Sequence, residues 1–273
     1  MTRVELHYGA ATDVGRVRSV NEDSYLASPP VFLVADGMGG HDGGDVASAI
    51  VAEEFGRFGG DELDPHAAGR RVTEVLRSCQ RRILEYAARN RAGGSPQWYS
   101  GTTAVIAVVV QDGDRPSWLI ANLGDSRAYR LHHGRLEQVS RDHSVVQELV
   151  DAGTITPEEI PTHPDRHVIT RALGGPDEVE PDFFLLPLPQ AERLLLCSDG
   201  VTGMLEDAAV AQILVQTDDP RMAADRLVAA AVEAGGRDNA TAVVVDVVGW
   251  LARDTQDATR QRVSLEDKLG ALP

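Results

Sequence analysis

Five short acidic clusters contain the residues of this sequence that could do chemistry. They are Asn21-Glu22-Asp23, Asp36-Gly37, Gly124-Asp125-Ser126-Arg127, Ser198-Asp199-Gly200 and Asp238-Asn239. Four of them lie at the edge of an apolar run. A strand that ends in Asp-Gly holds a carboxylate on rigid backbone and leaves a carbonyl oxygen uncovered. Several such ends could converge on a hard divalent cation, so we interpret the clusters as a carboxylate metal site.

The alternative interpretation is that these pairs are turns, because Asp-Gly is a common turn dipeptide and the chain has 42 Asp and Glu residues. Repetition favours the metal site, since apolar runs precede Asp36, Asp125 and Asp199. Carboxylate, carbonyl and water ligands suit Mg²⁺ or Mn²⁺ rather than Zn²⁺. Packed together without metal, the same acids would repel one another and have raised pKa values.

Composition limits the class of protein. A chain of 273 residues that is 42% hydrophobic can form one large domain with a sizeable core. It has no apolar stretch near the roughly 20 residues of a membrane span, and its N-terminus lacks the pattern of a secretory signal. We therefore expect a soluble, cytoplasmic protein that does not bind membranes. Cys79 and Cys197 fall in helix-like and strand-like runs, which favours two buried thiols over a disulfide bond.

The charge and the basic residues exclude other functions. A formal charge of −16 disfavours a nucleic-acid partner. Lys268 is the only lysine in the sequence, so Schiff-base chemistry and the lysine-containing phosphate loop of nucleotide triphosphatases are excluded.

Hydrophobic patterns predict separate groups of helices and strands. Helices are expected at 45–55, 65–89, 145–152, 208–216 and 221–233, and strands at 31–35, 102–110, 117–122, 128–131, 136–139, 183–188, 193–197 and 241–248. The strands between 101 and 139 are expected to form one antiparallel meander, and those at 183–188 and 193–197 a further pair. This grouping favours an α+β layered fold over a doubly wound parallel sheet.

Two segments have a different character. Residues 144–181 are rich in proline and irregular, and such a long insertion usually carries function or disorder. Residues 249–273 are polar. We expect a catalytic domain over 1–248, with 144–181 as a flap region, followed by a polar C-terminal tail over 249–273.

The acidic clusters, together with Arg18-Ser19-Val20 and Gly101-Thr102-Thr103, resemble in order the motifs of metal-dependent serine/threonine protein phosphatases of the type 2C class. The resemblance covers about residues 5–248. It implies a four-layer α-β-β-α sandwich, in which two antiparallel sheets pack face to face between helices. It also places the metal ions at one end of the sandwich and identifies 144–181 as the family's variable flap.

The resemblance also implies roles for individual residues. Asp36 would bridge two metal ions, the Gly37 carbonyl would bind the second ion, and Asp199 and Asp238 would hold the first. Glu22 and Asp23 would act mostly through bound water, and Asp23 could also orient or deprotonate the nucleophile. Asp125, together with Asp199, matches the position of a third metal ion in bacterial members.

The implied reaction is hydrolysis of phosphoserine and phosphothreonine in proteins, and a serine/threonine kinase is expected among the substrates. Two cations about 3.5–4 Å apart share a water molecule and direct it as hydroxide at phosphorus. Arg18 would bind phosphate oxygens with its planar guanidinium. By its chemistry alone, Arg18 could equally be an ordinary surface arginine.

One position departs from the family pattern. Met38 occupies the place where animal members carry a histidine proposed as general acid, so the leaving oxygen must take its proton from water or another group. We interpret His41 as a surface-loop residue and His143 as structural. Thr102 and Thr103 are expected to hold the sheet end beside the metals, and Asn239 to support the turn at Asp238.

Three other functions compete with this interpretation. A serine hydrolase with Ser126 as nucleophile fits poorly, because alanine replaces the last glycine of the Gly-x-Ser-x-Gly motif. A dinucleotide-binding loop after Gly37 has Asp42 where its third glycine belongs. A phosphoprotein-binding or regulatory module of the same fold, without turnover, stays open as the alternative, although the complete carboxylate set favours an enzyme.

Overall fold

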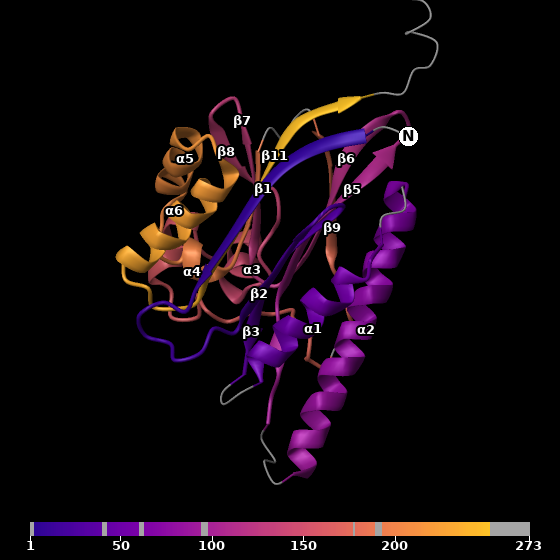
Figure 1. Cartoon of the computed structure of the whole chain (residues 1–273). Helices are drawn as coiled ribbons and strands as arrows, with labels where there is room; N and C mark the ends of the chain where they lie inside the picture. Colours follow the sequence, from indigo (N-terminus) through magenta and orange to yellow (C-terminus); the bar gives the residue numbers. More distant parts are fainter. Residues whose placement is uncertain are drawn as a thin grey trace, which may run out of the picture.

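Two antiparallel sheets form the centre of the protein in the computed structural model, which describes residues 3–39, 43–59, 63–93, 98–176, 178–188 and 193–251 (Figure 1). Sheet A has the strand order β1 (Arg3–Asp13), β11 (Ala240–Leu251), β10 (Arg193–Cys197), β7 (Arg127–His132) and β8 (Arg135–Gln138). Sheet B has the order β2 (Asp23–Ser28), β3 (Val31–Met38), β5 (Ala104–Asp112), β6 (Arg115–Leu123) and β9 (Asp182–Pro187), and β4 (Gly101–Thr102) pairs with β3.

Helices cover the outer face of each sheet. The helices α1 (Gly44–Gly56) and α2 (Pro65–Ala92) lie against sheet B, on the right in Figure 1. The helices α4 (Asp199–Thr202), α5 (Asp207–Gln216) and α6 (Pro220–Glu233) lie against sheet A, on the left. The flap region contains α3 (Val145–Asp151) and the 3₁₀ helix η1 (Pro157–Thr162). The four-layer α+β sandwich expected from the sequence is therefore confirmed.

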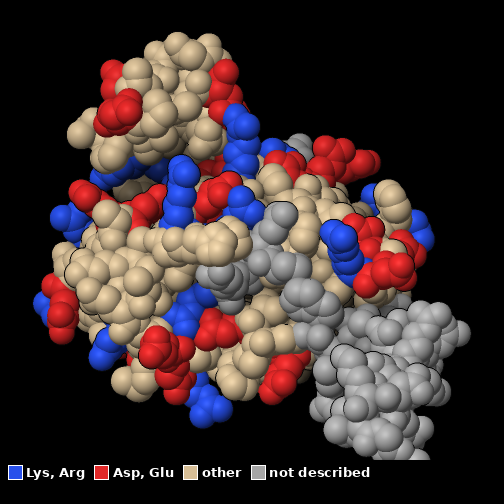
Figure 2. Space-filling model, turned by 90° about the horizontal axis from the view of Figure 1, so that it is seen from above, with Lys and Arg blue, Asp and Glu red and all other residues tan. Residues whose placement is uncertain are grey.

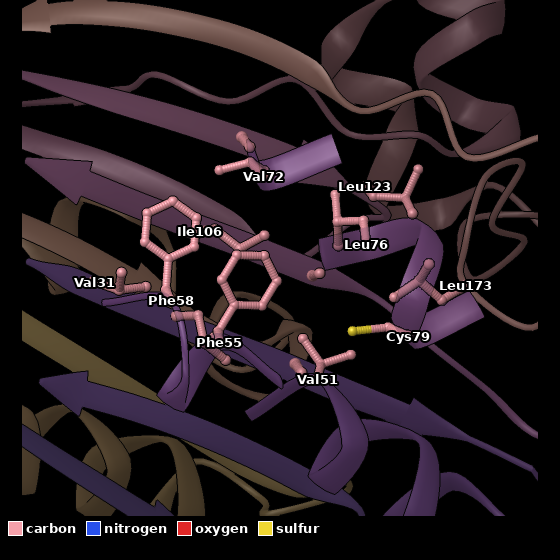
Figure 3. Packing of buried hydrophobic residues seen from close by; sticks show 14 of the residues in the cluster. Val31, Val51, Phe55, Phe58, Val72, Leu76, Cys79, Ile106, Leu123 and Leu173 are labelled. Carbon is pink, nitrogen blue, oxygen red and sulfur yellow. The ribbon is translucent and has the colours of Figure 1, made fainter. Parts of the chain in front are cut away.

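Three apolar cores hold the layers together. The core between the sheets includes Phe32 and Trp118, whose rings meet edge to face at 5.8 Å, and Leu194 and Val243 from sheet A. Figure 3 shows the core between sheet B and α1/α2, where Phe55 and Ile106 lie among the buried residues. A third core joins sheet A to α5 and α6. Burial of each such side chain contributes about 1.5–3 kcal/mol.

The longest helix follows directly from its sequence. Asp64 caps α2 by accepting a hydrogen bond from the backbone N–H of Ala67 at 2.9 Å, and a proline occupies the first turn. Its buried residues recur at three- and four-residue steps, as in Val72, Leu76, Cys79 and Ile83. The predicted helix at 65–89 is therefore correct at its start and three residues short at its end.

The predicted meander over 101–139 is wrong. The hairpin β5–β6 belongs to sheet B and the hairpin β7–β8 to sheet A, so the chain changes sheet at Gly124–Ser126. The segments 183–188 and 193–197 also do not pair, because β9 pairs with β6 and β10 with β7 and β11. Strand composition shows that a segment is extended but not which neighbour it finds. The strands β1 and β2 were not predicted.

Several smaller predictions concern the thiols, the surface and the chain ends. Cys79 and Cys197 are buried free thiols, as expected. On the face seen in Figure 2, acidic and basic side chains are interspersed. Among the described residues, no helix is both long enough and apolar enough to cross a bilayer. Strand β11 continues to Leu251, whereas residues 252–273 of the predicted tail, and His41, lie outside the described residues.

Candidate active site

The first acidic pair comes from two neighbouring strands of sheet B. Asp23 opens β2 and lies directly opposite Asp36 near the end of β3. The apolar run before Asp36 is buried, so the carboxylate is held on rigid backbone. At Gly37 a Cβ atom would collide with the backbone oxygens of Glu22 and Gly44, so only glycine permits this close approach.

Sheet A supplies the carboxylates on the other side. Asp199 follows the buried strand β10, and Asp238 lies just before β11. The two sheets meet here: Asp199 and Asp36 line the same cavity, and Ser198 donates from Oγ to Asp23 Oδ2 at 2.7 Å. The clusters that are far apart in the sequence therefore meet where the two sheets end together.

Burial dominates the electrostatics of these acids. It raises the pKa of Asp23 to about 7, against hydrogen bonds from Thr241 and Ser198 that lower it. It also raises the pKa of Asp125 to about 7, with Asp199 as the next cause. Burial raises the pKa of Asp199, and lifts that of Asp36 well above its ordinary value with the help of neighbouring carboxylates, which are Asp23, Asp199, Asp125 and Asp238. A cation would relieve this repulsion.

The donor set fits a hard divalent cation. Asp23 Oδ1 is buried and has no hydrogen-bond partner among the described residues. In the described ranges, no three His, Cys, Asp or Glu side chains are arranged to hold a metal ion by themselves. An ion here would therefore also need backbone carbonyl oxygens or water, as the Gly37 carbonyl and the water-mediated role expected for Glu22 would provide.

These residues surround a cavity of about 1070 Å³. Its lining includes Glu22, Asp36, Gly37, Asp125, Asp199 and Asp238, and Arg18 with Val20 from the loop after β1. Arg18 donates from Nη2 to Asp238 Oδ2 at 2.7 Å, and this bond raises the pKa of its guanidinium. Flap residues, among them Arg166 and His167, form another wall. Of the predicted site residues, only Asp23 does not line this cavity; it lies beside Asp36 on the neighbouring strand.

Thr102 at the end of β4 and Thr103 directly after it hold the backbone of Asp36, in keeping with the structural role expected for them. The hydroxyl of Thr102 donates to the Asp36 carbonyl at 2.9 Å, and the hydroxyl of Thr103 accepts from the Asp36 N–H at 3.0 Å. Thr103 Oγ1 also lies 2.8 Å from Ser126 Oγ. Ser126 is fully buried and β7 follows it, so Ser126 is not placed as a hydrolase nucleophile.

Asn239 does more than support the turn at Asp238. Its side-chain oxygen accepts from the Glu22 N–H at 2.8 Å, and its amide nitrogen donates to the carbonyls of Val14 and Val20 at 2.9 and 3.0 Å. Asn239 is buried and thus fixes the loop that carries Arg18 and Glu22. The sequence shows only that Asn239 follows Asp238 and gives no signal for these distant partners.

His143 is structural, as predicted, but its role was missed. Its Nδ1 accepts from the Gly124 N–H at 3.2 Å, and its Nε2 lies 3.2 Å from Asp182 Oδ2. Burial lowers the pKa of His143, which agrees with a neutral ring that donates from Nε2. His143 therefore fixes the turn that carries Asp125, whereas the adjacent Ser144 caps α3.

Comparison with known proteins assigns the class. The family model described as protein phosphatase 2C matches residues 16–231. The chain belongs to this family. It is 34% identical over 254 residues to the serine/threonine phosphatase stp of Listeria monocytogenes, covering 88% of this chain and 96% of that protein.

Mycobacterial relatives give a further comparison. The chain is 36% identical over 275 residues to the serine/threonine protein phosphatase PstP of Mycobacterium tuberculosis, covering all of this chain and 51% of PstP. It thus spans about half the length of that relative. The crystal structure of the PstP catalytic domain in complex with two manganese ions superposes with a TM-score of 0.75 at 35% identity, covering 89% of this chain and 99% of that one.

Proposed function

We propose that this chain hydrolyses phosphoserine and phosphothreonine in proteins, with two Mn²⁺ or Mg²⁺ ions and a third ion at Asp125. The observation that carries the proposal is the convergence of Asp36 and Asp199, two carboxylates that come from different sheets, line the same cavity and both have a raised pKa. Bringing these half-buried carboxylates side by side is costly unless a cation binds between them.

The ligands follow from the residues that line the cavity. Asp36 and the Gly37 carbonyl would hold the ions together with Asp199 and Asp238, and Glu22 would bind through water. Asp125 would hold the third ion with Asp199. When bound, the ions would lower the pKa of a water molecule and offset charge on the phosphoryl group.

The protein's own groups would bind and orient the reactants. Arg18 uses one guanidinium N–H on Asp238, which leaves others to donate to phosphate oxygens in the cavity. Asp23 Oδ1 has no partner among the described residues and can accept a hydrogen bond from water. The pKa of Asp23 is raised to about 7 in the metal-free protein and would fall with cations bound nearby, so this carboxylate would be ionised and able to orient or deprotonate the nucleophile.

The serine or threonine oxygen that leaves phosphorus during hydrolysis must gain a proton. Met38 lines the cavity but has no dissociable proton to give. The proton therefore comes from water or from another group of the site.

The substrates would be phosphorylated proteins, a serine/threonine kinase among them. This proposal is supported by family membership and by the phosphatase names of the relatives. A cytoplasmic location stays a prediction from the N-terminal sequence.

The test is a metal-dependence assay on phosphothreonine and phosphoserine peptides. Activity should require Mn²⁺ or Mg²⁺, disappear with EDTA, and fall at least about 100-fold in Asp36→Asn and Asp199→Asn. Asp112→Asn, at the exposed end of β5, is the matched control and should keep full activity. Robust activity in the first two variants would refute the assignment. Binding of phosphopeptide without turnover in the metal-loaded wild type would instead support the regulatory-module alternative.

A further inference from the structure

A second cavity, of about 450 Å³, adjoins the first. It shares Met38, His167 and Ile169 with the metal-site cavity, so the two are neighbours. Its remaining lining includes the apolar or aromatic residues Tyr99, Leu123, Val168, Ala172 and Pro176, and the polar residues Thr170, Arg171 and Glu178. A peptide with its phosphate over Asp36 could therefore extend into this second cavity.

Large apolar side chains are exposed around the two cavities. Tyr99 and Val168 are each 46% exposed and line the second cavity, and Val20, also 46% exposed, lines the first. Single exposed apolar residues need no explanation, but several gathered at the mouth of one site are typical of a binding surface.

One wall of the second cavity is tied to the body of the protein. The Gln80 side chain of α2 accepts from the Gly174 N–H and donates to the Gly175 carbonyl, both at 2.6 Å. Leu173 exchanges two backbone hydrogen bonds with Thr102, of 2.9 and 3.1 Å. This wall is therefore fixed to both α2 and sheet B.

A second part of the lining, at residues 168–170, is fixed in the same manner. The backbone N–H of Thr170 donates to the His143 carbonyl at 2.9 Å, and that of Val145 to the Val168 carbonyl at 2.9 Å. Ser144 and Ile169 form an isolated β-bridge. Because hydrogen bonds hold both parts of the lining, the cavity is preformed, as ligand pockets usually are.

We propose that this second cavity binds an apolar side chain of the substrate, close in sequence to the phosphorylated residue. The inference rests on the proposed phosphatase function and adds a substrate class: phosphopeptides with a flanking leucine, isoleucine, valine or methionine. The occupant is a segment of the phosphoprotein, because only the substrate must enter the adjoining metal-site cavity in every turnover.

The experiment measures kcat/KM for phosphothreonine peptides that carry either leucine or glycine at one flanking position, scanned over three positions on each side. At one or more positions, leucine should raise kcat/KM about tenfold over glycine, the usual value of one apolar group in a pocket. Equal values at every position of the scan would overturn the inference. Hydrolysis of the glycine peptide shows that the proposed phosphatase function holds, so the two failures can be told apart.

Val168→Asp places a charge in the lining of the second cavity. Val215→Asp is the matched control, because Val215 lies on α5, is 51% exposed and lines neither cavity. The leucine-to-glycine ratio should fall toward one in Val168→Asp, and a peptide with arginine at that position should gain. The ratio should not change in Val215→Asp. An unchanged ratio in Val168→Asp, with thermal unfolding like that of the wild type, would refute the assignment.

Discussion

Asp23 and Asp36 are direct partners in the antiparallel register of β2 and β3. A pair of like charges at such a position destabilises a sheet by itself. Here burial raises the pKa of both, and hydrogen bonds to Asp23 from Ser198 and Thr241 compensate only in part. The pairing is thus costly to the free protein, which accords with a site built for cations.

The metal-free protein should lose stability as pH rises. An acid whose pKa is higher in the folded than in the unfolded protein stabilises the folded state below the unfolded pKa of about 4. This stabilisation is lost as the pH rises to the folded pKa. For Asp125 the window runs from about 4 to about 7. In EDTA at pH 8, Asp125→Asn should therefore raise the unfolding temperature by several degrees, which corresponds to a gain of roughly 2 kcal/mol in the free energy of unfolding. At pH 4 the unfolding temperature should be almost unchanged.

The test compares the variant with the wild type because His143 also makes stability depend on pH. Its lowered pKa makes the folded protein less stable as the pH falls below about 6.5, which is opposite to the effect of Asp125. This contribution is common to both proteins and cancels in the difference. A stability difference that did not grow between pH 4 and pH 8 would contradict the electrostatic account of the site.

Arg18→Lys should show that the guanidinium binds phosphate. Lysine keeps the charge but loses the planar fork that can hold Asp238 and a phosphate oxygen together. We expect kcat/KM for phosphopeptides to fall about tenfold, and further in Arg18→Ala. Arg135→Ala, on the hairpin β7–β8 and outside the cavity lining, is the control. Equal kinetics in all three variants would reduce Arg18 to a surface residue.

Asn239→Ala should release the loop that carries Arg18. The change removes three hydrogen bonds to backbone groups at Val14, Val20 and Glu22. Loss of buried bonds of this kind costs on the order of 2–3 kcal/mol. Urea unfolding measures that loss, and limited proteolysis should show new cleavage between residues 14 and 22. Wild-type stability together with an uncut loop would mean that other contacts fix the segment.

His143→Phe should weaken the turn at Asp125 without creating a cavity. Phenylalanine fills a similar volume but leaves the Gly124 N–H without its acceptor. We expect a loss of about 1–3 kcal/mol in urea unfolding, and weaker binding of the proposed third Mn²⁺ ion in calorimetric titration. His66→Phe makes the same substitution at an exposed position of α2, and this matched control should change neither quantity. Unaltered unfolding and Mn²⁺ binding in His143→Phe would show that the turn does not depend on the imidazole.

Secondary structure could be predicted where it depends on residues that are close together in the sequence. The period of α2 and the Asp-Gly ends of buried strands can be read from neighbouring residues. Strand β1 also had a signal that was missed, since Val4, Leu6, Tyr8 and Ala10 alternate along it and pack on the core between the sheets. Strand β2, whose residues are exposed or half-buried, carried a weaker signal of this kind.

Long-range partners could not be predicted from the residues alone. Nothing near Asn239 indicates that its amide binds Val14 and Val20, because those contacts form only when the chain ends meet. The change of sheet at Gly124 was missed for a similar reason. Its positive φ of 111° sets the direction of the chain there, and a glycine in the sequence does not specify which of its many allowed angles it adopts.

Because the two central sheets each contribute one of the acids that meet at Asp36 and Asp199, neither half of the sandwich holds a working centre alone. Catalytic competence would therefore require both sheets to be assembled. A chain still emerging from the ribosome, without β10 and β11, could not hydrolyse phosphoproteins.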